Sequence, residues 1–149
     1  MMSMPMGGGG LVVAREDIVR ARGLLANGEE FLPSPAQAEN GDPRDTCYMT
    51  AIAAELGLKA YLSSQGWSDD RCRQDIRHDL EKGLSHADKS GMVGTGDDLG
   101  DVIAVLNAYY QCHAFDRFDS DPAFASKARA EVARLLDVVR PYVEASGGR

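Results

Sequence analysis

Apolar residues recur every three to four positions along most of this chain, and that spacing limits the fold more than any other feature. An α-helix makes one turn in about 3.6 residues, so the spacing gathers apolar side chains on one face, which must pack against another helix to leave water. No segment alternates strictly between apolar and polar residues. We therefore expect an all-α fold, an up-and-down bundle of four to five helices. The expected helices cover residues 14–27, 45–64 and 68–90, then Leu99 to near His113, and Pro122 through Tyr142.

Turn-forming residues separate these segments. Glycine follows each of the first three as a stop signal, at Gly28, Gly66 and Gly91. Residues 29–44 contain three prolines and are expected to form a connector, at most a partly ordered loop. We expect Pro141 to kink or end the last helix. The predicted organisation is a flexible N-terminal arm over residues 1–13, a single helical-bundle domain over 14–145 and a frayed C-terminus over 146–149.

The charge and cysteine content exclude several classes of protein. The formal net charge of -7 argues against a basic surface that coats DNA and against docking on an anionic membrane. The three cysteines form no CxxC pair, which indicates free thiols in a reducing cytoplasm rather than disulfides or a cysteine-rich zinc site. Neither an export signal nor an apolar run of about 20 residues is present, so we expect a cytoplasmic protein without a membrane span.

Two short sequence motifs in the second and third helical segments resemble those of a known family. The first is Glu55-Leu56-Gly57-Leu58-Lys59-Ala60-Tyr61-Leu62, and the second is His78-Asp79-Leu80-Glu81, followed by a helix that ends in glycine. Together they resemble the HEPN superfamily, many bacterial members of which look like E-L-x-L-K-A-x-L, a short connector and then H-D-L. The resemblance implies a bundle of four or five helices that often forms a homodimer through its helix faces.

The resemblance also implies candidate activities. Some HEPN proteins look like binding modules for a nucleotide or a protein partner, often beside a nucleotidyltransferase. Others look like metal-independent endoribonucleases, including toxins of toxin–antitoxin systems, with an arginine followed after four to six residues by a histidine. Arg73 and His78, with four residues between them, match that spacing. Gln74 departs from the pattern, because a small polar residue often follows the arginine, and the motif usually lies later in the chain.

Arg73 and His78 are the candidate catalytic residues of this ribonuclease hypothesis, with Arg77 as an alternative source of the cation. RNA cleavage without a metal needs a base for the 2′-hydroxyl proton and a cation at the phosphate. Histidine titrates near neutrality, and arginine offers phosphate a fork of donors. In a continuous helix the two side chains would point about 140° apart. A helix break just before His78, or a second copy of the chain, would be needed to bring them together.

Glu55, Lys59, Arg77 and Asp79 are the candidate ligand-binding residues. Glu55 and Lys59 also lie in the favourable order for a helix-surface ion pair, which is the plainer interpretation of both. Our leading hypothesis is a dimeric HEPN-like module that binds a nucleotide, an RNA or a protein partner. The alternatives are the endoribonuclease and a purely structural assembly domain. We expect no cofactor and no metal site.

Overall fold

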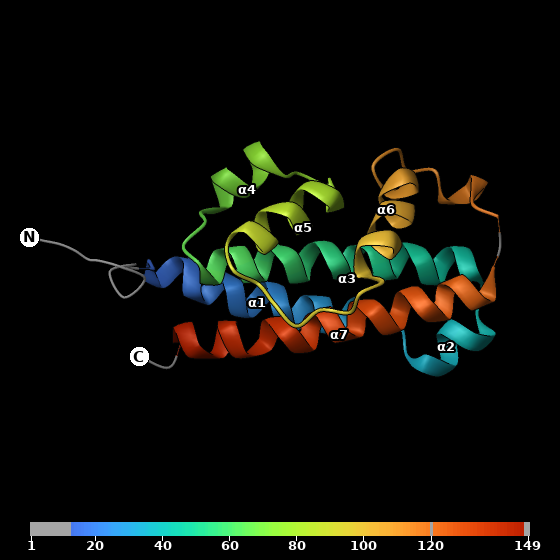
Figure 1. The fold of residues 1–149 in the computed structure, drawn as a ribbon, viewed down its shortest axis with the longest axis horizontal. Coiled ribbons are helices and arrows are strands. Elements are labelled where there is room, and N and C mark those ends of the chain that lie inside the picture. Colours follow the sequence, from blue (N-terminus) through green and yellow to red (C-terminus); the bar gives the residue numbers. More distant parts are fainter. Residues whose placement is uncertain (1–12, 120, 148–149) are drawn as a thin grey trace, which may run out of the picture.

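The computed structural model describes residues 13–119 and 121–147, which form helices joined by turns and loops, without a strand (Figure 1). The all-α fold predicted from the apolar spacing is therefore confirmed. The described residues contain seven α-helices, more than the four or five expected, and a short 3-10 helix. In chain order they are α1 (Arg15–Phe31), α2 (Pro35–Asn40), α3 (Pro43–Ser64), α4 (Asp69–Asp75), α5 (Leu80–Lys89), α6 (Leu99–Tyr110), η2 (Phe115–Arg117) and α7 (Pro122–Gly147).

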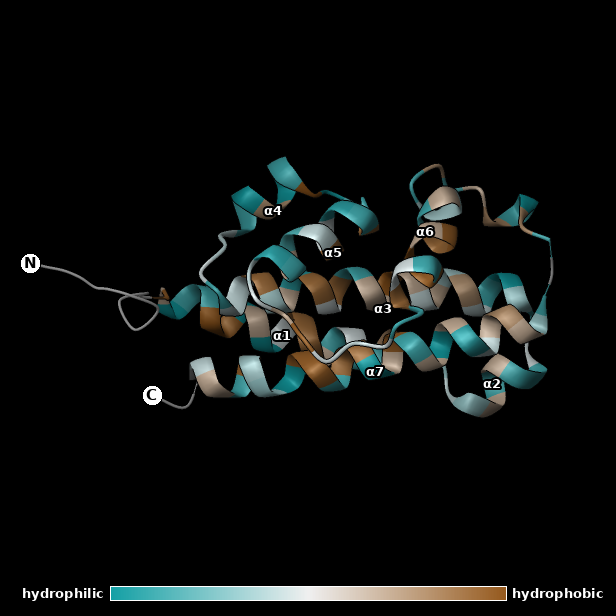
Figure 2. Cartoon of the chain, in the orientation of Figure 1, coloured by the Kyte–Doolittle hydropathy of each residue, from teal (hydrophilic) through white to brown (hydrophobic). Residues whose placement is uncertain are grey.

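Three long helices, α1, α3 and α7, lie side by side and form the body of the molecule (Figure 1). Small residues on α3 allow this close packing, and its four alanines and one glycine are buried: Ala51, Ala53, Ala54, Gly57 and Ala60. At Gly57, an added Cβ would lie 2.6 Å from Cδ2 of Leu136 on α7. Glycine at this position therefore lets the two helices approach. Figure 2 shows hydrophobic residues where the three helices face one another.

A second layer, made of α4, α5 and α6, lies on the other side of α3 from α1 and α7 (Figure 1). The helix α5 contributes Leu80 and Ala87 to the core, and α6 contributes Ile103 and Leu106. Leu80 and Ala87 lie seven residues apart, and Ile103 and Leu106 lie three apart, as expected for helices that bury one face. This layer brings the connection between α4 and α5, and the C-terminal end of α6, close to the middle of α3.

The helix expected over residues 68–90 is broken, and this corrects the sequence-based prediction. The segment forms α4 and α5, separated by residues 76–79. Arg77 has a φ of 56°, a left-handed conformation that cannot continue an α-helix. Asp79 then caps α5, because its carboxylate accepts a hydrogen bond from the Lys82 amide at 3.1 Å. His78 therefore lies within the break, directly after Arg77.

The expected connector over residues 29–44 was also wrong, because most of it is helical. The helix α1 continues through Gly28 to Phe31, and α2 occupies the centre of the segment. Ser34 caps α2 by accepting a hydrogen bond from the Gln37 amide at 3.1 Å, and proline follows at the first helical position.

The last helix differs from the expectation at its C-terminal end. Pro141 does not end α7, which runs on to Gly147, two residues past the predicted domain boundary at 145. The expected N-terminal arm over residues 1–13 lies, except for Val13, outside the described residues. No helix in the described ranges has the length and apolar character that crossing a membrane demands.

The three cysteines are free thiols in different environments. Cys47 on α3 and Cys72 on α4 are buried, whereas Cys112, just after α6, is exposed. Burial raises the pKa of the Cys47 thiol to about 12, and it also raises the pKa of Cys72. Both buried thiols therefore stay protonated and act as small apolar side chains in the core.

Candidate functional site

The carboxylate of Glu55, on α3, is the centre of the candidate site. Its side chain is only 11% exposed, and it accepts hydrogen bonds from three other side chains. Lys59 Nζ lies 2.8 Å from Oε2, the Tyr110 hydroxyl lies 2.6 Å from Oε1, and Nδ1 of His78 lies 2.9 Å from the same Oε1. These partners come from α3, the end of α6 and the α4–α5 connection. One largely buried carboxylate thus ties three parts of the chain together.

The charge on Glu55 determines the state of its partners. Burial works to raise the pKa of Glu55, but hydrogen bonds from Lys59, Tyr110 and His78 outweigh it and hold the pKa below its usual value. Burial and the neighbouring carboxylate raise the pKa of Tyr110, so its hydroxyl keeps the proton that it donates. An ionised carboxylate only accepts hydrogen bonds, so Nδ1 of His78 carries a proton. The Nε2 atom of His78, whose side chain is 66% exposed, is then available to a ligand.

A second polar cluster fixes the backbone beside His78. Asn107 on α6 is only 4% exposed, and its Oδ1 accepts a hydrogen bond from the buried Leu80 amide at 2.8 Å. Its Nδ2 donates to the carboxylates of Asp79 at 3.0 Å and Glu81 at 3.2 Å. Asp79 therefore caps α5 and is itself held by Asn107. Asp79, which was predicted as a ligand-binding residue, therefore positions the start of α5.

Arg73, predicted as the catalytic partner of His78, is directed elsewhere. Its guanidinium lies 2.7 Å from a carboxylate oxygen of Asp70 and 3.2 Å from one of Asp69, all on α4. The structure therefore pairs Arg73 with its own helix, and it forms no hydrogen bond or ion pair with His78. Arg77 is exposed, precedes His78 directly and forms no ion pair among the described residues.

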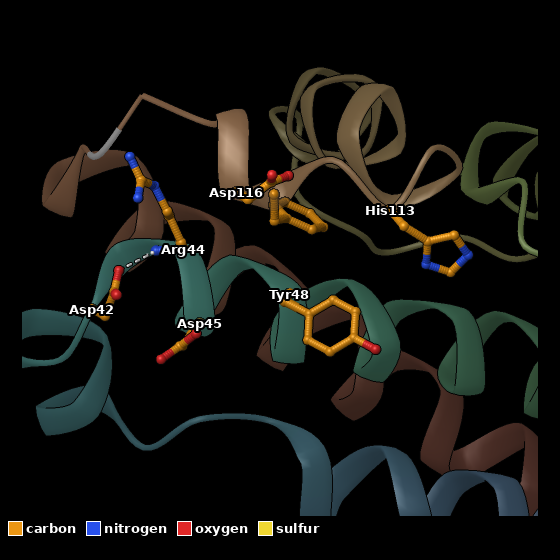
Figure 3. A pocket seen from close by; sticks show the side chains of 7 residues that line it. Asp42, Arg44, Asp45, Tyr48, His113 and Asp116 are labelled. Atoms are coloured by element: carbon orange, nitrogen blue, oxygen red, sulfur yellow. Dashed lines mark hydrogen bonds between the residues drawn. The ribbon is translucent and has the colours of Figure 1, made fainter.

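A hollow of about 540 Å³ lies beside this cluster, between the N-terminal half of α3 and the loop after α6. Its lining is Asp42, Arg44, Asp45, Tyr48, His113, Phe115 and Asp116. In Figure 3, Tyr48 lies on the α3 side, whereas His113 and Asp116 belong to the opposite loop. The Tyr48 and Tyr110 rings lie 6.3 Å apart between centroids, so the hollow adjoins the Glu55 cluster.

Sequence reasoning brought some of these residues together and missed others. It singled out Glu55, Lys59, His78 and Asp79, but the position of Glu55 between His78 and Tyr110 was not foreseen. Asn107 was missed, although an asparagine among the buried apolar positions of a helix is a signal, because a buried amide needs partners. Tyr110 was read only as part of the apolar stripe of its helix. The described residues contain no group of three or more His, Cys, Asp or Glu placed to hold a metal ion.

Comparisons with known proteins identify one family. The family model of the HEPN domain matches residues 21–142, a range that begins within α1 and ends within α7. It includes the whole of the Glu55 cluster and of the adjoining hollow. No curated protein and no solved structure matches the chain.

Proposed function

The chain belongs to the HEPN domain family, and on that premise we propose that it is a binding module for a phosphate-bearing ligand, a nucleotide or an RNA. The proposed phosphate site is the exposed edge formed by His78 and Arg77. One observation carries this proposal: a largely buried carboxylate, Glu55, holds an exposed imidazole in one orientation. A surface histidine without a ligand gains little from such support, whereas a binding residue held in place loses less entropy when its ligand arrives.

The chemistry of the edge suits a phosphate. With Nδ1 bonded to Glu55, a protonated His78 offers Nε2–H as a charge-assisted donor, and Arg77 adds a planar fork of donors from the next residue. The acidic balance of the whole chain restricts anion binding to such a local site. A left-handed residue such as Arg77 costs free energy, and positions of this kind cluster at ligand sites.

Binding measurements on the full chain test the proposal. A fluorescein-labelled RNA oligomer and a radiolabelled nucleotide are titrated with the protein at low salt, with anisotropy and equilibrium dialysis as the readouts. We expect His78→Ala and Arg77→Ala to weaken binding. Arg73→Ala is the matched control, because it removes an exposed arginine that Asp69 and Asp70 already hold. An equal loss in all three variants would contradict the proposed site, and a parent protein that binds neither ligand would refute the function.

An endoribonuclease is the second candidate, and the same contact favours it. A carboxylate bonded to Nδ1 orients an imidazole as a general base. Arg73, the arginine of the matching motif, would have to leave its aspartates or come from a second copy of the chain. Incubation with structured RNA in EDTA tests this activity. Cleavage that His78→Ala and Arg73→Ala both abolish would support it, and intact RNA after incubation with the parent protein would exclude it under those conditions.

Dimerisation is a separate part of the proposal, and the outer face of α6 supports it. Four small or apolar residues of this helix are exposed: Gly100, Ala104, Val105 and Ala108. Such a face allows a helix of a second copy to approach closely. We expect sedimentation to detect a dimer that Val105→Glu dissociates. Only monomer at high concentration would contradict this. A dimer that binds no nucleotide or RNA would favour the purely structural alternative, and co-purification with a nucleotidyltransferase would favour the protein-partner alternative.

A further inference from the structure

Four aromatic rings connect the phosphate edge to the hollow beside α3. The ring centroids of His78 and Tyr110 lie 6.2 Å apart, those of Tyr110 and Tyr48 lie 6.3 Å apart, and those of Tyr48 and Phe115 lie 6.0 Å apart. Tyr48 is 42% exposed, so part of its ring can contact a ligand. The phosphate edge and the hollow therefore lie on either side of one buried ring, that of Tyr110.

Backbone strain marks both the phosphate edge and the hollow. Arg77 and His113 have φ values of 56° and 52°, and they are the non-glycine residues with positive φ in the described ranges. Each costs free energy relative to glycine, although histidine adopts this conformation more often than most residues do. One of them directly precedes His78, and the other carries its imidazole to the rim of the hollow (Figure 3). Both residues lie just after the end of a helix, α4 or α6, where a left-handed residue commonly ends the helix.

The lining of the hollow suits a planar group that carries hydrogen-bond donors. Tyr48 offers an exposed aromatic face for stacking, and aromatic faces of this kind hold unstacked bases in RNA-binding proteins. Asp45 and Asp116 are exposed and add carboxylate acceptors, while Asp42 is occupied as the cap of α3. The three carboxylates outnumber Arg44, the arginine of the lining, so the hollow disfavours a phosphate and we place the phosphate outside it.

We infer that the hollow binds the base of a guanine nucleotide whose phosphate lies at His78 and Arg77. This inference rests on the proposed function, since it names the ligand of the same surface. Guanine presents two adjacent donors, N1–H and N2–H, which match the two oxygens of one carboxylate. Adenine offers the carboxylate only its exocyclic amino group, and uracil a single N–H between two acceptors. The base stacks on Tyr48, and Asp45 or Asp116 accepts its two hydrogen bonds.

Equilibrium dialysis with GMP and AMP tests the inference in the full-length protein. We expect GMP to bind about fivefold or more tightly than AMP, which is the discrimination of one bidentate contact. Tyr48→Ala should weaken GMP binding by about fivefold or more, whereas Tyr48→Phe keeps the stacking face and restores it. Circular dichroism checks that both variants remain folded.

The carboxylates of Asp45 and Asp116 are tested through the ratio of the affinities for GMP and AMP. Removing negative charge strengthens the binding of any nucleotide, but only the loss of base contacts changes the preference for GMP. The double variant Asp45→Asn/Asp116→Asn should bring the ratio close to one. Asp97→Asn/Asp101→Asn makes the same charge change near the start of α6 and should leave the ratio unchanged.

The outcomes separate this inference from the function on which it rests. Equal binding of GMP and AMP, unaffected by Tyr48→Ala but lost in His78→Ala, would overturn the guanine site and leave the phosphate site standing. No binding of either nucleotide, or of short RNAs with a single central G or A, would overturn both. Binding of the G-containing RNA without binding of GMP would identify an RNA residue, rather than a free nucleotide, as the source of the guanine.

Discussion

Two substitutions of Asn107 measure separately the cost of a lost hydrogen bond and the cost of a buried charge. Asn107→Leu removes the acceptor of the buried Leu80 amide and the donor to Asp79 and Glu81. A buried N–H left without a partner costs about 1–3 kcal/mol, whereas the two carboxylates are partly exposed and can turn to water. We therefore expect Asn107→Leu to lower the free energy of unfolding by about 2 kcal/mol, independently of pH.

Asn107→Asp has nearly the same shape and keeps the acceptor for the Leu80 amide. At neutral pH, however, its second oxygen faces the carboxylates of Asp79 and Glu81, where Nδ2 now donates to them. An uncompensated buried charge costs about 3–5 kcal/mol. The new carboxyl avoids this cost by holding its proton, so its folded pKa lies above its unfolded value of about 3.9. The penalty is then absent below the unfolded pKa and grows as the pH rises toward the folded one.

Urea unfolding, followed by circular dichroism, measures both variants against the parent protein. At pH 7 we expect Asn107→Asp to be less stable than Asn107→Leu, and near pH 4 we expect the order to reverse. Comparing each variant with the parent at the same pH removes the general acid sensitivity of the chain. If the loss in Asn107→Asp were the same at both pH values, the contact with the two carboxylates would not explain the role of Asn107.

The lowered pKa of Glu55 means that its contribution to stability is complete above the usual carboxyl pKa and is lost as the pH falls through the lowered value. The stability gap between the parent and Glu55→Gln, measured by urea unfolding, should therefore narrow below about pH 4, and a constant gap would contradict this. Arg77→Gly should not reduce stability, because glycine relieves the left-handed backbone, while Arg73→Gly within α4 should cost about 1 kcal/mol. Equal losses in thermal unfolding would refute this account of the helix break. Pro141→Ala should raise the free energy of unfolding, by up to about 3 kcal/mol, because proline inside α7 lacks an amide donor and crowds the carbonyl four residues earlier. A lower melting temperature for this variant would show that the proline contributes packing that we have not identified.

The apolar spacing predicted the fold class because burial of one helix face leaves a periodic trace in sequence. The apolar spacing could not predict the break at residues 76–79, because the same spacing continues across it. Cys72, Ile76 and Leu80 lie four residues apart and are all buried, although the backbone between the last two is not helical. Neither glycine nor proline marks residues 76–79. The break depends instead on tertiary contacts, namely those of Asn107 and Glu55.

Residues 29–44 show the opposite error, because their local signals were available. Ser34 before Pro35, and Asp42 before Pro43, each combine a capping residue with proline at the first helical position. The prolines were read as breakers, although proline at that position starts a helix. For the site, the two motifs of the HEPN resemblance contain Glu55, Lys59, His78 and Asp79. The hollow could not be foreseen, because Tyr48 and His113 are 65 positions apart in the printed sequence and meet only through the packing of α6 on α3.

Because Cys112 is exposed and the other two cysteines are buried, the protein carries one thiol that a reagent can label beside the hollow. A maleimide dye added to the native protein would attach at Cys112, the neighbour of His113, because the other two thiols are buried and held in their protonated form. One fluorophore would then sit at the rim of the hollow without any engineering of the chain. Slow incorporation of a second and third label would time the opening of the core around α3 and α4, so a single reagent would report on both the surface and the interior.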